Sequence, residues 1–174
     1  MARRLHGLIF KTYLTLNYIQ MKKKVLLLSL IAVLFVAGAF AQSQKAMLYS
    51  KNAKLAQNKK IVYDFWREIL EAGHIEFATK YMMESYIQHN PNVATGRQPI
   101  VDYFTKYVKP IPVVDTIKAP LIAIVAEGDL VVLTFKQEYP DPKEKGKQYT
   151  STWFDMLRVE NGKIAEHWDP STKQ

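Results

Sequence analysis

The chain contains no cysteine, and this absence excludes several kinds of chemistry at once. Disulfide bonds, zinc sites with thiolate ligands, thiol nucleophiles and lipid attachment through an N-terminal cysteine are all ruled out. Glycine is also scarce, and its seven occurrences form neither a GxGxxG nor a GxxxxGK phosphate-binding loop. The GxSxG motif of serine hydrolases is missing too. Any reaction must therefore use other side chains.

The body of the chain lacks an excess of positive charge, although the net charge of the whole is +8. Six of the 24 basic residues lie within residues 1–41, which contain no acidic residue. The remaining 18 basic residues are nearly balanced by 16 acidic ones. Such a small excess does not favour a polyanion-binding surface, so we expect no nucleic-acid partner.

A secretory signal is predicted over residues 21–41. Met21 and three lysines precede an apolar run that ends in Ala39-Phe40-Ala41, a small-x-small pattern typical of signal peptidase sites. A membrane anchor is the alternative, but it needs about 20 apolar residues. Residues 1–20 are predicted to be an upstream extension, since Met21 already begins a complete signal; an unusually long leader is the alternative. We expect an exported protein, periplasmic or extracellular, without membrane association after cleavage.

Three helices are predicted in the first half of the remaining chain, which forms a single domain. Apolar residues recur at helical spacing over residues 51–72, 75–83 and 95–108. Gly73 is expected to end the first helix, and Thr95 to cap the third. The domain boundaries expected are a lead-in with the start of the first helix at 42–57, the folded domain at 58–170 and a tail at 171–174.

Strands are predicted after Pro112, where the period of the apolar residues changes. Segments rich in β-branched and aromatic residues cover 117–126, 130–139, 149–159 and 164–168. Asn161-Gly162 predicts a tight hairpin between the last two segments. Helices followed by an antiparallel sheet indicate an α+β fold in which the sheet curls around the helices.

The last hairpin offers a candidate site. With a two-residue turn, Met156 pairs with His167 and Phe154 with Asp169, so these four residues share one face. Apolar surroundings raise the pKa of a carboxyl group, which suits a general base. A bulged turn would shift the partner strand by one residue but keep His167 and Asp169 together. The alternative is that Asp169 is a solvated residue at the strand end and His167 a half-buried sheet residue.

A second polar cluster follows the second predicted helix, in the segment Tyr86-Ile87-Gln88-His89-Asn90-Pro91. Its side chains supply several hydrogen-bond donors and acceptors, but an ordinary turn around Asn90-Pro91 is the alternative interpretation. No HxH or HExxH spacing brings two histidines together, so we expect no metal ion.

These segments resemble the SnoaL-like polyketide cyclase family of the nuclear transport factor 2-like superfamily. The resemblance covers residues 58–170 and is carried by Tyr86 to Pro91, by Glu127 to Val131 and by Phe154 to Asp169. It implies a curved antiparallel sheet wrapped around three N-terminal helices, with a cone-shaped pocket between them. It also implies catalysis without a cofactor, in which a carboxylate removes a proton next to a carbonyl group.

The resemblance implies roles for individual residues. Asp169 corresponds to the catalytic base, assisted by His167. Substrate-binding residues are expected at the following positions: Tyr86, His89, Asn90, Phe154 and Met156. The activity implied is that of a cofactor-independent lyase or isomerase acting on a small, largely apolar carbonyl compound.

An exported polyketide cyclase has no evident supply of substrate, so a non-catalytic binding module is the alternative function. Accessory assembly through the sheet is a weaker one. We also expect a homodimer, because four apolar residues are predicted on the outer face of the sheet. They are Trp153, Leu157, Ile164 and Trp168.

Overall fold

The computed structural model describes residues 21–24 and 44–173. The apolar part of the predicted signal lies outside the described residues. Among the described residues, no helix has the length and apolar character needed to cross a membrane. The chain divides into two compact units, residues 1–43 and residues 44–174, and the second unit contains the folded domain described below.

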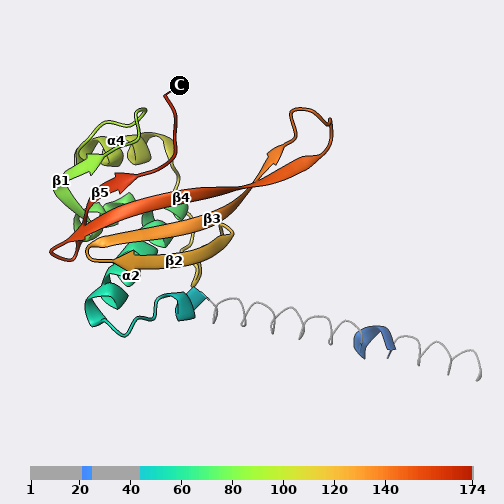
Figure 1. Cartoon of the computed structure of the whole chain (residues 1–174), viewed down its shortest axis with the longest axis horizontal. Coiled ribbons are helices and arrows are strands. Elements are labelled where there is room, and N and C mark those ends of the chain that lie inside the picture. Colours follow the sequence, from blue (N-terminus) through green and yellow to red (C-terminus); the bar gives the residue numbers. More distant parts are fainter. Residues whose placement is uncertain (1–20, 25–43, 174) are drawn as a thin grey trace, which may run out of the picture. The chain divides into compact units, whose positions relative to one another are not determined.

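A five-stranded mixed sheet forms one layer of this domain (Figure 1). Its strands are β1 (Met82–Gln88), β2 (Leu121–Glu127), β3 (Leu130–Pro140), β4 (Gln148–Glu160) and β5 (Lys163–Trp168). Their order is β1-β5-β4-β3-β2, with β1 parallel to β5 and the other pairs antiparallel. The predicted α+β class is confirmed, and the parallel edge strand β1 is the exception to the expected antiparallel pairing.

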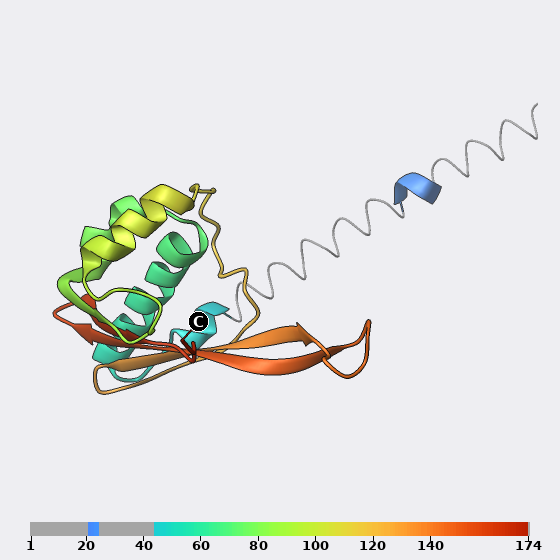
Figure 2. The same cartoon turned by 90° about the horizontal axis from the view of Figure 1, so that it is seen from above.

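Helices cover one face of the sheet (Figure 2). They are α2 (Ala53–Phe65), the π-helix η1 (Trp66–Glu71), the 3-10 helix η2 (Ile75–Phe77), α3 (Ala78–Tyr81) and α4 (Arg97–Tyr107). The Asn52 side chain caps α2 by accepting the backbone N–H of Lys54 at 2.9 Å. Gly73 follows η1 with φ +78°, and a Cβ there would lie 2.8 Å from the Val108 side chain. The predicted stop of the first helix is confirmed.

The second predicted helix is shorter than expected. Helical structure ends at Tyr81, and β1 begins at Met82, where the prediction continued the helix. Strand β1 was not predicted, because its apolar residues do not alternate with polar ones and its partner β5 lies about eighty residues away in the sequence. The third helix agrees with the prediction, except that Thr95 does not cap it; its hydroxyl donates to the Gln88 carbonyl instead.

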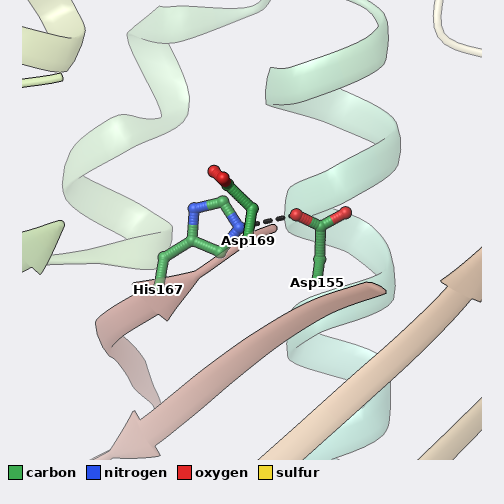
Figure 3. Close-up of side chains that lie close together, drawn as sticks. All are labelled: Asp155, His167 and Asp169. Atoms are coloured by element: carbon green, nitrogen blue, oxygen red, sulfur yellow. Dashed lines mark hydrogen bonds and ion pairs between the residues drawn. The ribbon is translucent and has the colours of Figure 1, made fainter. Parts of the chain in front are cut away.

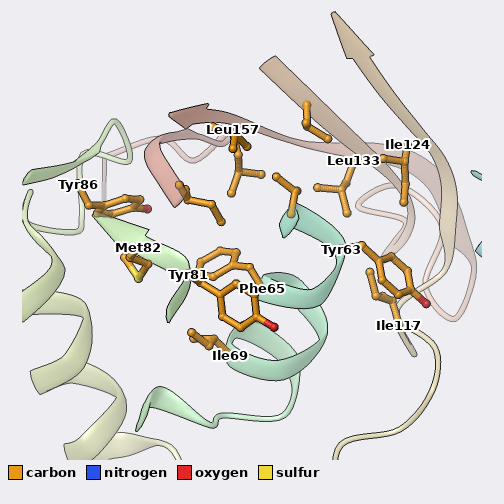
Figure 4. Packing of buried hydrophobic residues seen from close by; sticks show 14 of the residues in the cluster. Tyr63, Phe65, Ile69, Tyr81, Met82, Tyr86, Ile117, Ile124, Leu133 and Leu157 are labelled. Atoms are coloured by element: carbon orange, nitrogen blue, oxygen red, sulfur yellow. The ribbon is translucent and has the colours of Figure 1, made fainter. Parts of the chain in front are cut away.

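The hydrophobic core lies between the helices and the sheet (Figure 4). Phe65 and Ile69 contribute from the helical side, and Leu133 and Leu157 contribute from β3 and β4. All four side chains are at most 1% exposed. This packing anchors the inner face of the sheet, so the parity of each residue along a strand decides whether it reaches the core.

A bulge in the last hairpin changes which residues of β4 lie opposite those of β5, compared with the predicted register. The Asn161-Gly162 turn pairs Glu160 with Lys163, as predicted. The next pair is Val159 with Ile164, and the one after it is Arg158 with Glu166. Ala165 is therefore an extra residue on β5, and the register shifts there by one. Leu157 then lies opposite His167, and Met156 lies opposite Trp168. The predicted pairing of Met156 with His167 is therefore wrong.

The shift moves several residues to the opposite face from the one predicted. Leu157 and Ile164 were predicted on the outer face of the sheet, and this prediction is wrong, because both are fully buried in the core. Phe154 is 50% exposed, and Met156 lies on the same outer side, two residues further along β4. Neither residue belongs to the face that carries His167.

Candidate functional site

A cavity of about 390 Å³ lies at the end of the domain where β1, β5 and α4 meet. Its polar lining comes from Tyr86, Gln88, Asn90, Asn92, His167 and Asp169. Its apolar lining includes Phe65, Leu70, Met82, Ile100, Tyr103 and Phe104. An apolar cavity with a few converging polar groups is the usual form of a small-molecule site.

His167 on β5 is paired with a buried carboxylate on the neighbouring strand β4. Its Nε2 lies 2.8 Å from the Oδ1 atom of Asp155 (Figure 3). The other oxygen of Asp155 accepts the indole N–H of Trp153 at 3.0 Å. Asp155 is only 2% exposed. Burial raises the pKa of the Asp155 carboxyl group, and the hydrogen bond from His167 offsets part of this increase.

Gln88 on β1 determines which nitrogen of His167 carries the proton. The backbone N–H of Asn90 donates to the Gln88 amide oxygen at 3.0 Å. The Gln88 amide nitrogen therefore faces His167, 3.2 Å from Nδ1, and also donates to the Tyr86 hydroxyl at 3.0 Å. Because an amide N–H only donates, Nδ1 is the acceptor and the imidazole proton resides on Nε2. This network describes a neutral His167.

Asp169 follows β5 and lines the cavity. Both of its carboxylate oxygens accept the side-chain amide of Asn90, at 3.2 and 2.9 Å. The backbone N–H of Ser171 donates to Oδ1 at 2.9 Å. Burial by itself would raise the pKa of Asp169, but the hydrogen bonds from Ser171 and Asn90 outweigh it, and the net pKa lies below the ordinary value. The increase expected from the sequence is not found at this residue.

Tyr86 on β1 is a hydrogen-bond donor at the buried end of the cavity. Its side chain is 1% exposed. Burial, with smaller contributions from the charges of Asp169 and Asp155, raises the pKa of the phenol, which therefore stays protonated. Its oxygen accepts the Gln88 amide N–H, so its own hydrogen remains for another acceptor. Among the described residues, no acceptor for that hydrogen is found within hydrogen-bond distance.

His89 lies on the other side of the sheet, away from the cavity. Its ring stacks on Trp168 with 4.4 Å between the ring centroids. Its Nε2 lies 2.9 Å from a carboxylate oxygen of Glu166. Of the seven site residues expected from the sequence, Tyr86, Asn90, His167 and Asp169 line the cavity. His89, Phe154 and Met156 do not belong to its lining.

Three side chains of the site lie close enough to hold a metal ion. One ligand atom from each of Asp155, His167 and Asp169 falls within 4.8 Å of the others. A metal on Nε2 would displace the proton to Nδ1, which would then need an acceptor. Nδ1 instead faces the amide nitrogen of Gln88. The hydrogen-bond network therefore favours a proton over a metal ion at this position.

Sequence reasoning missed the structural roles of Asp155 and Gln88. The predicted place of Phe154 and Met156 on the site face put Asp155, which stands between them, on the opposite face, because the bulge at Ala165 could not be located. Gln88 was part of the polar cluster, but its function required the parallel pairing that places it opposite His167. The sequence offered one signal: Asp155 is a carboxylate with apolar residues directly before and after it. A buried aspartate requires hydrogen-bond partners, so this position indicated a polar network in the sheet.

Comparisons with known proteins give one family and a set of similar structures. The family model described as SnoaL-like polyketide cyclase matches residues 60–172, well over half of the chain. No curated protein matches the sequence.

Three of the similar solved structures illustrate the range. A candidate polyketide cyclase of Acidithiobacillus ferrooxidans is 20% identical, with 70% of this chain and 89% of that chain covered and a TM-score of 0.45. A protein of unknown function with a cystatin-like fold from Xanthomonas campestris is 19% identical, with coverages of 67% and 92% and a TM-score of 0.46. An LEH-like epoxide hydrolase of M. tuberculosis is 11% identical, with coverages of 65% and 76% and a TM-score of 0.46.

Proposed function

Because this chain belongs to the SnoaL-like polyketide cyclase family, we propose that it binds a small, largely apolar carbonyl compound in the cavity and catalyses acid–base chemistry on it without a cofactor. The observation that carries the proposal is the position of Asp169, a carboxylate at the polar end of an otherwise mostly apolar cavity. The reaction class is an aldol-type cyclisation, an isomerisation or a dehydration, since all three begin with proton removal next to a carbonyl group.

Asp169 acts as the general base in this proposal. Its carboxylate takes a proton from the carbon next to the carbonyl group, and the electrons of the broken C–H bond move to the carbonyl oxygen as an enolate. The hydrogen bonds from Asn90 and Ser171 hold the carboxylate in one orientation. Fixed orientation reduces the entropy lost when the reacting groups meet.

Tyr86 stabilises the enolate. Its hydroxyl hydrogen is available because the oxygen already accepts from Gln88, and its raised pKa keeps it protonated near a developing negative charge. A pre-positioned donor in a site of low polarity stabilises an oxyanion more than water does. His167 has both ring nitrogens engaged by Gln88 and Asp155, so it supports the site rather than donating to the substrate.

The test is exchange of the hydrogens next to the carbonyl group of benzylacetone in deuterium oxide, followed by proton NMR. Asp169→Asn should lower the enzyme-dependent rate by about 100-fold or more, because a positioned general base contributes that much. Asp102→Asn, on the exposed side of α4, is the matched control and should keep the rate. Equal rates for wild type and Asp169→Asn would remove Asp169 as the base.

A non-catalytic binding module is the second candidate function, and one observation favours it. The hydrogen bonds from Ser171 and Asn90 leave the pKa of Asp169 below its usual value, and a less basic carboxylate has less driving force for proton removal. Saturable binding of benzylacetone without exchange of its hydrogens would select this alternative.

We further propose that the domain functions after export, with the signal at residues 21–41 removed. Detection of the mature chain, beginning near Gln42, in the exported fraction of the producing cells would support this proposal. A chain retained in the cytoplasm with residues 21–41 still attached would contradict it.

A further inference from the structure

The cavity contains an unbalanced negative charge. Asp169 is the one charged residue among the described residues that line it. Lys163 and Arg97 line a separate surface groove, where they donate to the backbone oxygens of Thr79 and Met82. Asp155 does not line the cavity. One of its carboxylate oxygens nevertheless lies within 4.8 Å of a ring nitrogen of His167 and of a carboxylate oxygen of Asp169.

Among the described residues that line the cavity, His167 is the one side chain that could supply a balancing positive charge. It would do so only as an imidazolium, in which both ring nitrogens donate hydrogen bonds. Asp155 can accept from Nε2, but Nδ1 faces the amide N–H of Gln88. Rotating the amide of Gln88 would not help, because its oxygen is engaged by the backbone N–H of Asn90. The Asn90 N–H therefore fixes the orientation of the Gln88 amide, and this amide in turn fixes the tautomer of His167.

We propose that Gln88 is a specificity-determining residue: by holding His167 neutral, it leaves the charge of Asp169 uncompensated, so that the cavity accepts uncharged ligands and excludes carboxylates and phosphates. The inference rests on the proposed function in taking this cavity as the binding site. An anionic ligand would meet the carboxylate of Asp169 in surroundings of low polarity, where like charges repel strongly. An uncharged carbonyl oxygen would instead accept the free hydroxyl hydrogen of Tyr86, which is 1% exposed.

The first experiment measures the protonation of His167 directly, by the nitrogen chemical shifts of its imidazole ring at neutral pH. The expected pattern is that of a neutral ring with its proton on Nε2. Gln88→Glu replaces the amide by an acceptor of the same shape and should convert His167 to the imidazolium form. Gln88→Met removes the donor without supplying an acceptor, so the imidazolium fraction should lie between those of the wild type and Gln88→Glu; a ring as neutral as in the wild type would show that Gln88 does not hold this state. An imidazolium signal in the wild type would overturn the proposal.

The second experiment compares two probes of similar shape, the ketone benzylacetone and the acid hydrocinnamate, in which a carboxylate oxygen takes the place of the methyl group of the ketone. Calorimetric titration of the wild type should show hydrocinnamate binding about 100-fold more weakly than the ketone, as expected for like charges a few ångströms apart. Asp169→Asn should abolish most of this difference. Equal or tighter binding of hydrocinnamate to the wild type would overturn the proposal, as would an unchanged ratio in Asp169→Asn.

Failure of the proposed function would look different from failure of this inference. A ketone that binds, but whose hydrogens do not exchange, would contradict the general-base role and leave the preference for uncharged ligands intact. The ring-nitrogen measurement needs no ligand, so it decides the state of His167 even when neither probe binds.

Discussion

The two faces of β5 use the same residue types in opposite ways. On the inner face, His167 pairs with Asp155, and the two side chains are 9% and 3% exposed. On the outer face, His89 pairs with Glu166, and their side chains are 38% and 18% exposed. Both pairs have hydrogen-bond lengths close to 2.8 Å. The two pairs therefore differ in burial and not in local geometry. The buried pair belongs to the cavity region, whereas the more exposed pair lies on the protein surface.

The largest expected difference between the two faces is in stability. His167→Ala removes a hydrogen-bond donor from buried Asp155 and should lower the free energy of unfolding by about 3 kcal/mol. His89→Ala removes a partly exposed pair and a stacking contact on Trp168, and should cost less than about 1 kcal/mol. Urea unfolding of both variants provides the measurement. Similar losses for the two would show that burial does not distinguish the pairs.

A second prediction separates the two carboxylates of the inner face by pH. The net pKa of Asp169 is lowered, so its carboxylate stabilises the fold above the ordinary aspartate pKa, and this contribution disappears as pH falls through the lowered value. Burial raises the pKa of Asp155, so ionisation of this group costs stability as pH rises from the ordinary value to the raised one.

The stability of Asp169→Asn relative to the wild type should therefore fall as pH rises from about 3 to 7, whereas that of Asp155→Asn should rise. Urea midpoints measured across this range, with Asp102→Asn as the surface control, test both slopes. Slopes of the same sign for the two inner-face variants would contradict the assignment.

The sequence predicted most of the helices and hairpins because their signals are local. Helical spacing located α2, and the Asn161-Gly162 dipeptide located the last turn together with its first residue pair. Strand β1 could not be predicted, because its hydrogen-bond partner β5 is distant in the sequence. The composition of Met82–Gln88 alone does not distinguish a strand from the end of a helix.

The site was predicted in part, for the same physical reason. His167 and Asp169 are two residues apart, so they remain neighbours whatever the register of the hairpin. Phe154 and Met156 were assigned to that face through the cross-strand pairing, and one bulge at Ala165 was enough to reverse them. A bulge depends on how the sheet packs against the helices, and local sequence carries little information about that.

The smallest expected effect on folding concerns the outer face of the sheet. We propose that the domain forms a homodimer through this face, but with other contact residues than the sequence indicated. Val125, Val132, Met156 and Trp168 lie side by side across four strands, and Phe154 beside them is 50% exposed. An apolar row of this kind on an isolated monomer favours burial against a second copy.

Phe154→Ser should leave the free energy of unfolding of the monomer within about 0.5 kcal/mol of the wild type, as is usual for exposed positions. It should nevertheless weaken association, because it removes a large aromatic contact from the middle of the apolar row. Sedimentation at tens of micromolar measures this. Tyr149→Ser, also exposed and one residue after the start of β4, is the control and should associate normally; this end of the β3–β4 hairpin extends beyond the helices (Figure 2). A wild type that is strictly monomeric would contradict the dimer, and the outer face would then be an apolar surface without a self-association role.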